Sequence, residues 1–164
     1  MSKPPRDRTS FGSNTYFITA STWGGRSLFQ TDRMAGLFLD TIFHYRREKK
    51  FLLHEFVIMP NHFHLLLTPL EIALERAVQL VKGGFSYRVK KEFGLGMEIW
   101  ERGYVDHRIR DANDYRRHVE YIRQNPVQAH RTEKAEAYAY SSAHEGFELD
   151  PHPQGLKPEL SRLA

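Results

Sequence analysis

The apolar stretch 56–68 constrains this chain most, because a turn signal and two histidines interrupt it. Pro-Asn at 60–61 predicts a tight turn, and the apolar runs on either side are long enough for two strands joined as an antiparallel hairpin. Side chains alternate between the two faces of a strand, so His62 and His64 point one way and Phe63 the other. The second strand therefore presents two imidazoles side by side, as one half of a metal site would.

Composition limits the chain to one ordinary domain with a packed core. Its 164 residues are 40% hydrophobic and 13% aromatic, so disorder is not expected overall. No apolar run approaches the roughly 20 residues of a membrane helix, and residues 1–9 lack the apolar region of a secretory signal. Cysteine is absent, which excludes disulfides and thiolate metal ligands and is consistent with a cytoplasmic protein. The formal net charge of +4 favours a polyanionic partner.

Hydrophobic periodicity predicts the order strand, helix, strand, strand, helix, strand, helix. Strands are expected over 14–23, 51–59, 62–67 and within 98–110; helices are expected over 31–47, 68–93 and 114–124. Thr31 is the expected N-cap of the first helix, and Thr68 with Glu71 forms a capping box for the second. Asn125-Pro126 is expected to end the last helix. The first six elements predict an α+β, ferredoxin-like split βαβ fold, an antiparallel sheet with helices on one face.

The predicted domain organisation is simple. Residues 1–13 form a flexible N-terminal lead, 14–143 a single domain, and 144–164 a loose C-terminal tail. Inside the second helix, Gly83-Gly84 predicts either a kink or close approach by another backbone.

Two stripes run along the last helix. The core stripe contains Tyr115, Val119 and Ile122, spaced four and three apart. A second stripe, about 60–120° round the helix, contains His118, Tyr121 and Asn125. Tyr121 and Asn125 are one turn apart and can face a common site. Tyr121 lies off the core face, where a structural tyrosine would be expected.

These motifs resemble those of a known family. The His62-Phe63-His64 triplet after a Pro-Asn turn, followed by Tyr-Ile-Arg-Gln-Asn-Pro at 121–126, is similar to the single-tyrosine HUH transposases. The resemblance extends over about residues 16–143 and includes the stretches 99–104 and 106–110. Insertion-sequence members typically carry Gln where this chain has Asn125, which favours the branch associated with repetitive extragenic palindromes (REP).

The resemblance implies an HUH endonuclease fold that cuts and rejoins single-stranded DNA, folded into a hairpin. It implies that Tyr121 is the nucleophile of a 5′-phosphotyrosine intermediate, and that His62, His64 and Asn125 hold a divalent metal. A ligand set without thiolate suits Mg²⁺ or Mn²⁺. His118, one turn from Tyr121, is a possible assistant to the nucleophile. Relatives act as monomers or as homodimers, so the sequence leaves open whether the active site forms within one chain.

Basic side chains that could contact DNA phosphates cluster near the last helix and along the second. They are Arg108, Arg110, Arg116, Arg117 and Arg123, with Lys82 and Arg88. The same residues could equally form an ordinary solvated face. We assign no role from the sequence to His54, His107 or His130.

Two other functions remain open from the residues alone. The chain could be a non-catalytic nucleic-acid-binding module that uses the same sheet. It could instead be a metal-dependent nuclease in which water attacks and Tyr121 is structural. For Asn125, a helix-terminal role before Pro126 is an alternative to metal ligation.

Overall fold

The computed structural model describes residues 14–94 and 96–158; the predicted N-terminal lead, 1–13, lies outside them. Within the described residues, four strands and three α-helices form the fold. The strands are β1 (Tyr16–Ser21), β2 (Phe51–Met59), β3 (His62–Pro69) and β4 (Val105–Arg108), and the α-helices are α1 (Asp32–Arg47), α2 (Leu74–Phe93) and α3 (Ala112–Gln128). Single 3₁₀ turns occur at η2 (Trp23–Gly25), η3 (Leu28–Gln30) and η4 (Ala135–Ala137).

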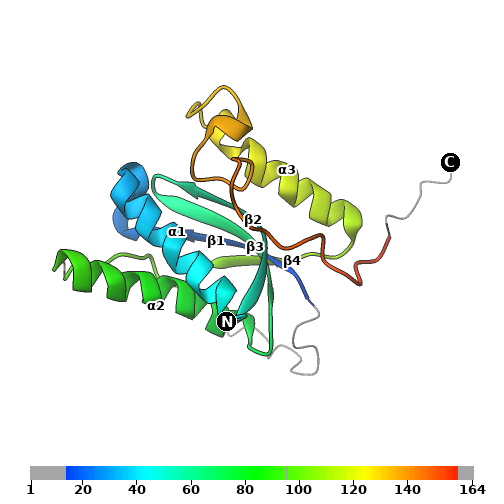
Figure 1. Ribbon diagram of the computed structural model, residues 1–164, viewed down its shortest axis with the longest axis horizontal. Coiled ribbons are helices and arrows are strands. Elements are labelled where there is room, and N and C mark those ends of the chain that lie inside the picture. The colour runs from blue at the N-terminus through cyan, green and yellow to red at the C-terminus, as the bar shows by residue number, and fades with distance from the viewer. Residues whose placement is uncertain (1–13, 95, 159–164) are drawn as a thin grey trace.

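The sheet has the strand order β2-β3-β1-β4, with every neighbouring pair antiparallel. Helices α1 and α2 cover one face, and α3 lies across the other (Figure 1). This confirms the predicted ferredoxin-like arrangement of the first six elements. The third helix adds a layer on the opposite face, which makes β3 and β1 central strands buried between helices.

The larger core lies between the sheet and the helices α1 and α2. Phe38, Phe63, Phe85 and Trp100 meet there, with ring centroids 4.8 Å apart for Phe38 and Phe63 and 5.7 Å apart for Phe85 and Trp100. Burying each such side chain contributes about 1.5–3 kcal/mol. Phe63, on the opposite face of β3 from the two histidines, is fully buried in this core.

A smaller apolar cluster fixes α3 to the other face. It consists of Val57, Met59, Leu66, Ile109, Tyr115 and Ile122. Val119 packs at its edge, so the predicted core stripe of the last helix is confirmed. Asp111 is the N-cap of α3, since its Oδ1 accepts the Asp114 N–H at 2.7 Å. The cap and the stripe together decide which side of α3 faces the sheet.

Two predicted helix boundaries are wrong. The capping box at Thr68 does not form: β3 continues through Pro69 and α2 begins only at Leu74. The reason is that the buried Thr68 hydroxyl makes hydrogen bonds to Thr15 and to His54 of β2. Nor does Pro126 end α3, which continues to Gln128. Proline within the last turn of a helix removes only one hydrogen bond, and Pro126 is buried against the body of the protein.

Gly84 allows close packing between α1 and α2. A Cβ placed on Gly84 would lie 2.5 Å from the Tyr45 Oη, whereas a Cβ on Gly83 would meet nothing within 4 Å. The close approach predicted from the Gly pair is therefore real at Gly84, although a side chain makes it rather than a backbone.

The C-terminal segment covers the edge of β2. Ser141 bridges Val57 in antiparallel fashion, and the Ile58 N–H donates to the Tyr140 carbonyl at 2.8 Å. Further on, the Asp150 carboxylate accepts from the Leu53 N–H and from the Arg46 guanidinium. The prediction of a loose tail from residue 144 is thus wrong for the part described, which extends to 158. Unpaired strand edges invite association with other chains, so this cover also protects the sheet.

A series of buried hydrogen bonds joins the C-terminal segment to β2, β3 and the residue before β1. His54 is an extra residue in β2, between Leu53 and Glu55, which pair with consecutive residues of β3. Its Nδ1 lies 2.9 Å from the Pro151 carbonyl and its Nε2 2.8 Å from the Thr68 Oγ1, which in turn lies 2.6 Å from the Thr15 Oγ1. Burial lowers the pKa of His54, although hydrogen bonds to the segment 150–151 oppose the shift.

None of the helices in the described ranges combines the length and apolar character needed to span a membrane.

The His54 pKa predicts a loss of stability in acid. Because its folded-state pKa lies below the unfolded value of 6.5, His54 leaves the folded state unaffected above that pH and destabilises it progressively as pH falls below about 6.5. His54→Gln should be less stable than wild type at pH 7.5, and the gap in urea midpoint should narrow towards pH 5. Parallel midpoint curves for the two proteins would contradict this account.

Candidate active site

The α3-facing side of β3 carries the two predicted metal ligands. His62 and His64 project from the same face, with ring centroids 5.0 Å apart. His62 lies at the half-exposed start of the strand, while His64 is 4% exposed. The hairpin through Pro60-Asn61 therefore places one imidazole at the rim of the site and one inside it.

Both imidazoles are held through their Nδ1 atoms. The His64 Nδ1 lies 2.8 Å from the Thr19 Oγ1, and the His62 Nδ1 lies 2.8 Å from the Asn61 Oδ1. Within the described residues, the buried Nε2 of His64 has no hydrogen-bond partner. Buried polar atoms are rarely left unpaired, so this nitrogen is available for a ligand that the protein chain does not supply.

The electrostatics of the pair favour neutral rings. Burial lowers the pKa of His62, and burial together with the neighbouring His62 ring lowers that of His64 to about 3. At neutral pH each ring keeps a lone pair, which is the form in which histidine binds metal. The residues present thus fit a divalent cation at this position.

Helix α3 brings the predicted nucleophile to the same place. The Tyr121 ring contacts the His64 ring edge-on, with centroids 5.3 Å apart, yet Tyr121 stays 52% exposed. Phe17 of β1 lies in the middle: its ring stacks on His64 at 5.1 Å and meets Tyr121 at 5.8 Å. One side of the Tyr121 ring therefore packs on Phe17 and His64, and the other side is accessible to a substrate.

Asn125 follows Tyr121 by one turn and is half-buried on α3. Its backbone carbonyl accepts the Ala129 N–H at 3.0 Å. Assignment of its side-chain amide as a third ligand stays a prediction.

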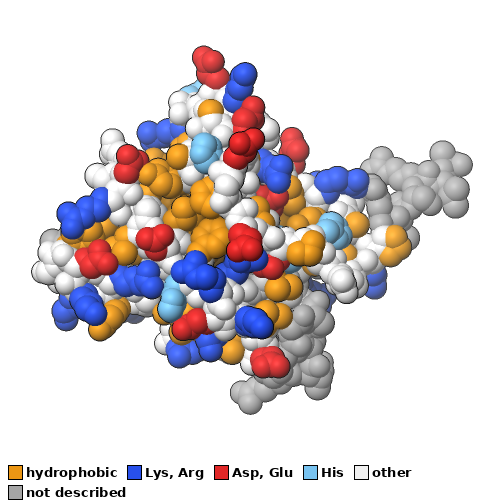
Figure 2. Space-filling view, in the orientation of Figure 1, with side chains coloured by type: hydrophobic (Ala, Val, Ile, Leu, Met, Phe, Trp, Pro, Cys, Tyr) orange, Lys and Arg blue, Asp and Glu red, His pale blue; other side chains and the backbone are white. Residues whose placement is uncertain are grey.

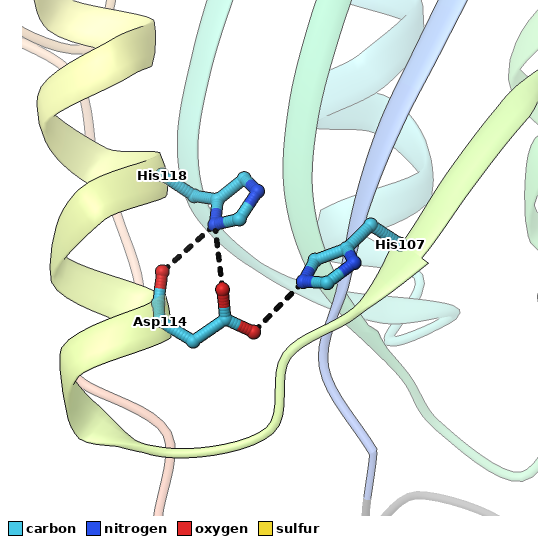
Figure 3. Close-up of side chains that lie close together, drawn as sticks. All are labelled: His107, Asp114 and His118. Carbon is cyan, nitrogen blue, oxygen red and sulfur yellow. Dashed lines mark hydrogen bonds and ion pairs between the residues drawn. The ribbon is translucent and has the colours of Figure 1, made fainter. Parts of the chain in front are cut away.

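A second polar group lies beside this site, between β4 and α3. Figure 3 shows His107 from the strand and Asp114 and His118 from the helix, with both imidazoles directed at Asp114. The His107 Nε2 lies 2.8 Å from the Asp114 Oδ2, and one nitrogen or oxygen of each residue lies within 4.8 Å of the others. Asp114 is buried, so the group is a second place with the residue types that bind metals.

Sequence reasoning missed four residues of this region. The sequence predicts Thr19 and Phe17 only as strand residues and Asp114 only as a helix residue, and it predicts no role for His107. Pairing of Thr19 with His64 and of Phe17 with His107 across β1 brings them together. The paired residues are far apart in the chain: 45 residues separate Thr19 from His64 (64 − 19), and 90 separate Phe17 from His107 (107 − 17). The alternation of β1 was the available signal, because Phe17 and Thr19 share a face.

The predicted DNA-contacting side chains divide into two groups. Lys82 and Arg88 belong to α2, on the sheet face opposite Tyr121, and the Lys82 Nζ donates to the Glu101 and Gly103 carbonyls. Arg123 pairs with the buried Glu55 at 2.7 Å and so fastens α3 to β2. The remaining four are exposed: Arg108 in β4, Arg110 just before α3, and Arg116 and Arg117 in α3. Arg110 and Arg117 lie 3.9 and 3.5 Å from the Asp114 carboxylate, whereas Arg108 follows His107 and so points to the other face of the sheet.

Charge on the face seen in Figure 2 is mixed. Basic and acidic side chains alternate there over the helices, with apolar side chains between them. That face has no large field of one sign, so the net positive charge alone does not locate a polyanion site.

Comparison with known proteins decides the family. Residues 14–125 match the family model described as "Transposase IS200 like". The chain belongs to the IS200-like transposase family. The matched range begins just before β1 and ends at Asn125, so it includes both histidines and Tyr121.

Individual relatives of this transposase support the same family assignment. A REP-associated tyrosine transposase of Escherichia coli K12 is 30% identical over 138 residues, covering 79% of this chain and 76% of its own length. A Haemophilus influenzae protein assigned to the same group is 29% identical, covering 98% and 97%. A solved structure of a REP-associated tyrosine transposase bound to a REP hairpin is 26% identical with a TM-score of 0.70, covering 86% of this chain and 82% of that one. The resemblance to the REP-associated branch is confirmed.

The Thr19–His64 contact generates a test of whether His64 binds a metal. Thr19→Val keeps the shape of the side chain but removes the oxygen that holds the His64 Nδ1. It should weaken Mn²⁺ binding by roughly 10- to 100-fold, as loss of such supporting contacts does elsewhere. Thr19→Ser keeps the hydroxyl and should bind nearly as wild type. Equal affinities of the Val and Ser variants, measured by isothermal titration calorimetry, would show that the hydroxyl has no such role.

Proposed function

We propose that this transposase cuts and rejoins single-stranded, hairpin-forming DNA through a covalent 5′-phosphotyrosine at Tyr121. The observation that carries the proposal is the contact between Tyr121 and His64 within one chain, beside an unpaired His64 Nε2. The solved relative bound to a REP hairpin supports the same class of DNA substrate.

A divalent metal, Mg²⁺ or Mn²⁺, is part of the proposal. His62 and His64 would hold it through their Nε2 atoms, and Asn125 through its amide oxygen, one turn beyond Tyr121. The bound cation would supply positive charge that neutralises a non-bridging phosphate oxygen. Neutral imidazoles and an amide oxygen leave the charge of the cation undiminished for that purpose.

The chain's own groups account for the remaining requirements. The half-exposed Tyr121 phenol attacks phosphorus while the ring is held against Phe17 and His64. Attack joins the 5′-phosphate to the phenolic oxygen and releases a 3′-hydroxyl. Because the phosphotyrosine keeps a phosphodiester bond, a 3′-hydroxyl can reverse the reaction and join strands without ATP. Arg108, Arg110, Arg116 and Arg117 would contact phosphates of the DNA backbone.

The test uses labelled single-stranded hairpin oligonucleotides, including the REP hairpin of the solved relative, with Mg²⁺ or Mn²⁺. Wild type should form a covalent protein–DNA adduct that survives denaturing gels. Tyr121→Phe should form none, yet bind the hairpin within about threefold of wild type, because one exposed hydroxyl contributes little to affinity. Tyr138→Phe, which removes a hydroxyl bonded to the Ile58 carbonyl, is the matched control and should keep the adduct.

Two results would contradict the proposal. Cleavage without an adduct, retained in Tyr121→Phe, would indicate a nuclease that uses water. Salt-sensitive hairpin binding without metal-dependent cleavage in wild type would indicate a binding module.

A further inference from the structure

The His118 ring is anchored on one side. Its Nδ1 lies 2.7 Å from the Asp114 backbone carbonyl and 3.3 Å from the Asp114 Oδ1 (Figure 3). Both oxygens are acceptors, so the Nδ1 carries the hydrogen and a neutral His118 keeps its lone pair on Nε2. The tautomer of His118 is therefore set by Asp114.

Asp114 is suited to this role because it is a buried carboxylate, with a side chain 3% exposed. Burial alone would raise its pKa, but the hydrogen bonds from the Arg110 N–H and from His107, with the charges of His107 and His118, lower the pKa overall. Arg117 and Arg110 also face it, at 3.5 and 3.9 Å. The carboxylate thus stays ionised and acts as an acceptor.

His118 and Tyr121 lie on the same side of α3 and share Phe17 as a neighbour. Tyr121 follows His118 by three residues on the same stripe of α3. The Phe17 ring contacts both, at 4.8 Å to His118 and 5.8 Å to Tyr121. Tyrosine ionises near pH 10 in water, so attack at neutral pH needs a group that takes the phenolic proton.

The same geometry disfavours a metal within this group. The His107 and His118 rings stack face to face, with centroids 4.7 Å apart and planes 17° apart. Lone pairs lie in the ring planes, so two stacked rings do not direct them at one ion. Arg110 and Arg117 add positive charge at the carboxylate. The arrangement of His107, Asp114 and His118 therefore suits proton transfer better than metal binding.

We propose that His118 is the base that takes the Tyr121 proton, and that Asp114 with His107 is the positioning pair that fixes its tautomer. This rests on the proposed function. As the Tyr121 oxygen bonds to phosphorus, its proton passes to the His118 Nε2. The bond from phosphorus to the 3′-oxygen breaks, and that oxygen leaves with the electron pair and takes a proton from water. Strand joining runs the same transfers in reverse.

The test is the pH dependence of single-turnover adduct formation on the hairpin, at saturating Mn²⁺. A base that must be deprotonated before it accepts the phenolic proton makes the rate rise with pH and then level off, so the wild-type rate should show this profile. His118→Gln should be roughly 10²-fold slower at pH 7, and its rate should keep rising over the pH range in which the wild-type rate has levelled off. Asp114→Asn and His107→Gln should slow the reaction less and displace the levelling-off point. His144→Gln is the control; this half-buried histidine lies with its Nδ1 2.8 Å from the Glu136 carbonyl.

The outcomes separate the inference from the function on which it rests. A wild-type profile retained in His118→Gln overturns the inference while the Tyr121 adduct still forms. Absence of any Tyr121 adduct in wild type overturns the proposed function and the inference with it. A second equivalent of Mn²⁺ or Zn²⁺, bound by wild type and lost in Asp114→Asn, would assign the group to a metal instead. Thermal melting checks folding, and if Asp114→Asn does not fold, His118→Gln alone decides.

Discussion

The alternation of β3 is the constraint on which the rest of the structure depends. Phe63, Leu65 and Leu67 are buried in the core beneath α1 and α2. Because side chains alternate along β3, His62 and His64 must point to the opposite face of the sheet. A slip of one residue would put both imidazoles into the aromatic core and Phe63 into the site. The large free energy of burying Phe63 therefore fixes the position of the two imidazoles.

The second requirement is that α3 lies across its own sheet. Tyr115 and Ile122 pack on β2 and β3, and the Arg123–Glu55 ion pair joins the helix to the edge strand. Glu55 is buried, so removing Arg123 would leave a costly unpaired charge. The C-terminal segment closes this edge, where the Ser142 hydroxyl bonds the same carboxylate. Together these contacts hold Tyr121 against His64 in a single chain.

Much of this could be predicted from the sequence, because the decisive signals are local. The turn at 60–61, the period of two in β3 and the two stripes of α3 were sufficient for the hairpin, the histidine pair and the offset of Tyr121. The predicted helix boundaries are wrong where tertiary contacts override local preference. At Thr68, the hydroxyl makes hydrogen bonds to Thr15 and His54 instead of capping a helix. The contacts of Thr19 and Phe17 with the His64 ring could not be predicted either, since they arise only when β1 pairs with β3.

The account's central claim is that one chain assembles the whole site. Mixing a His64→Ala protein with a Tyr121→Phe protein tests this directly, with adduct formation on the hairpin as the measurement. Each variant lacks one half of the site, and neither chain can complete itself. The account predicts that the mixture forms no adduct at any ratio. Adduct formation restored in the mixture would contradict it, because a tyrosine from one chain would then be acting beside the histidines of another.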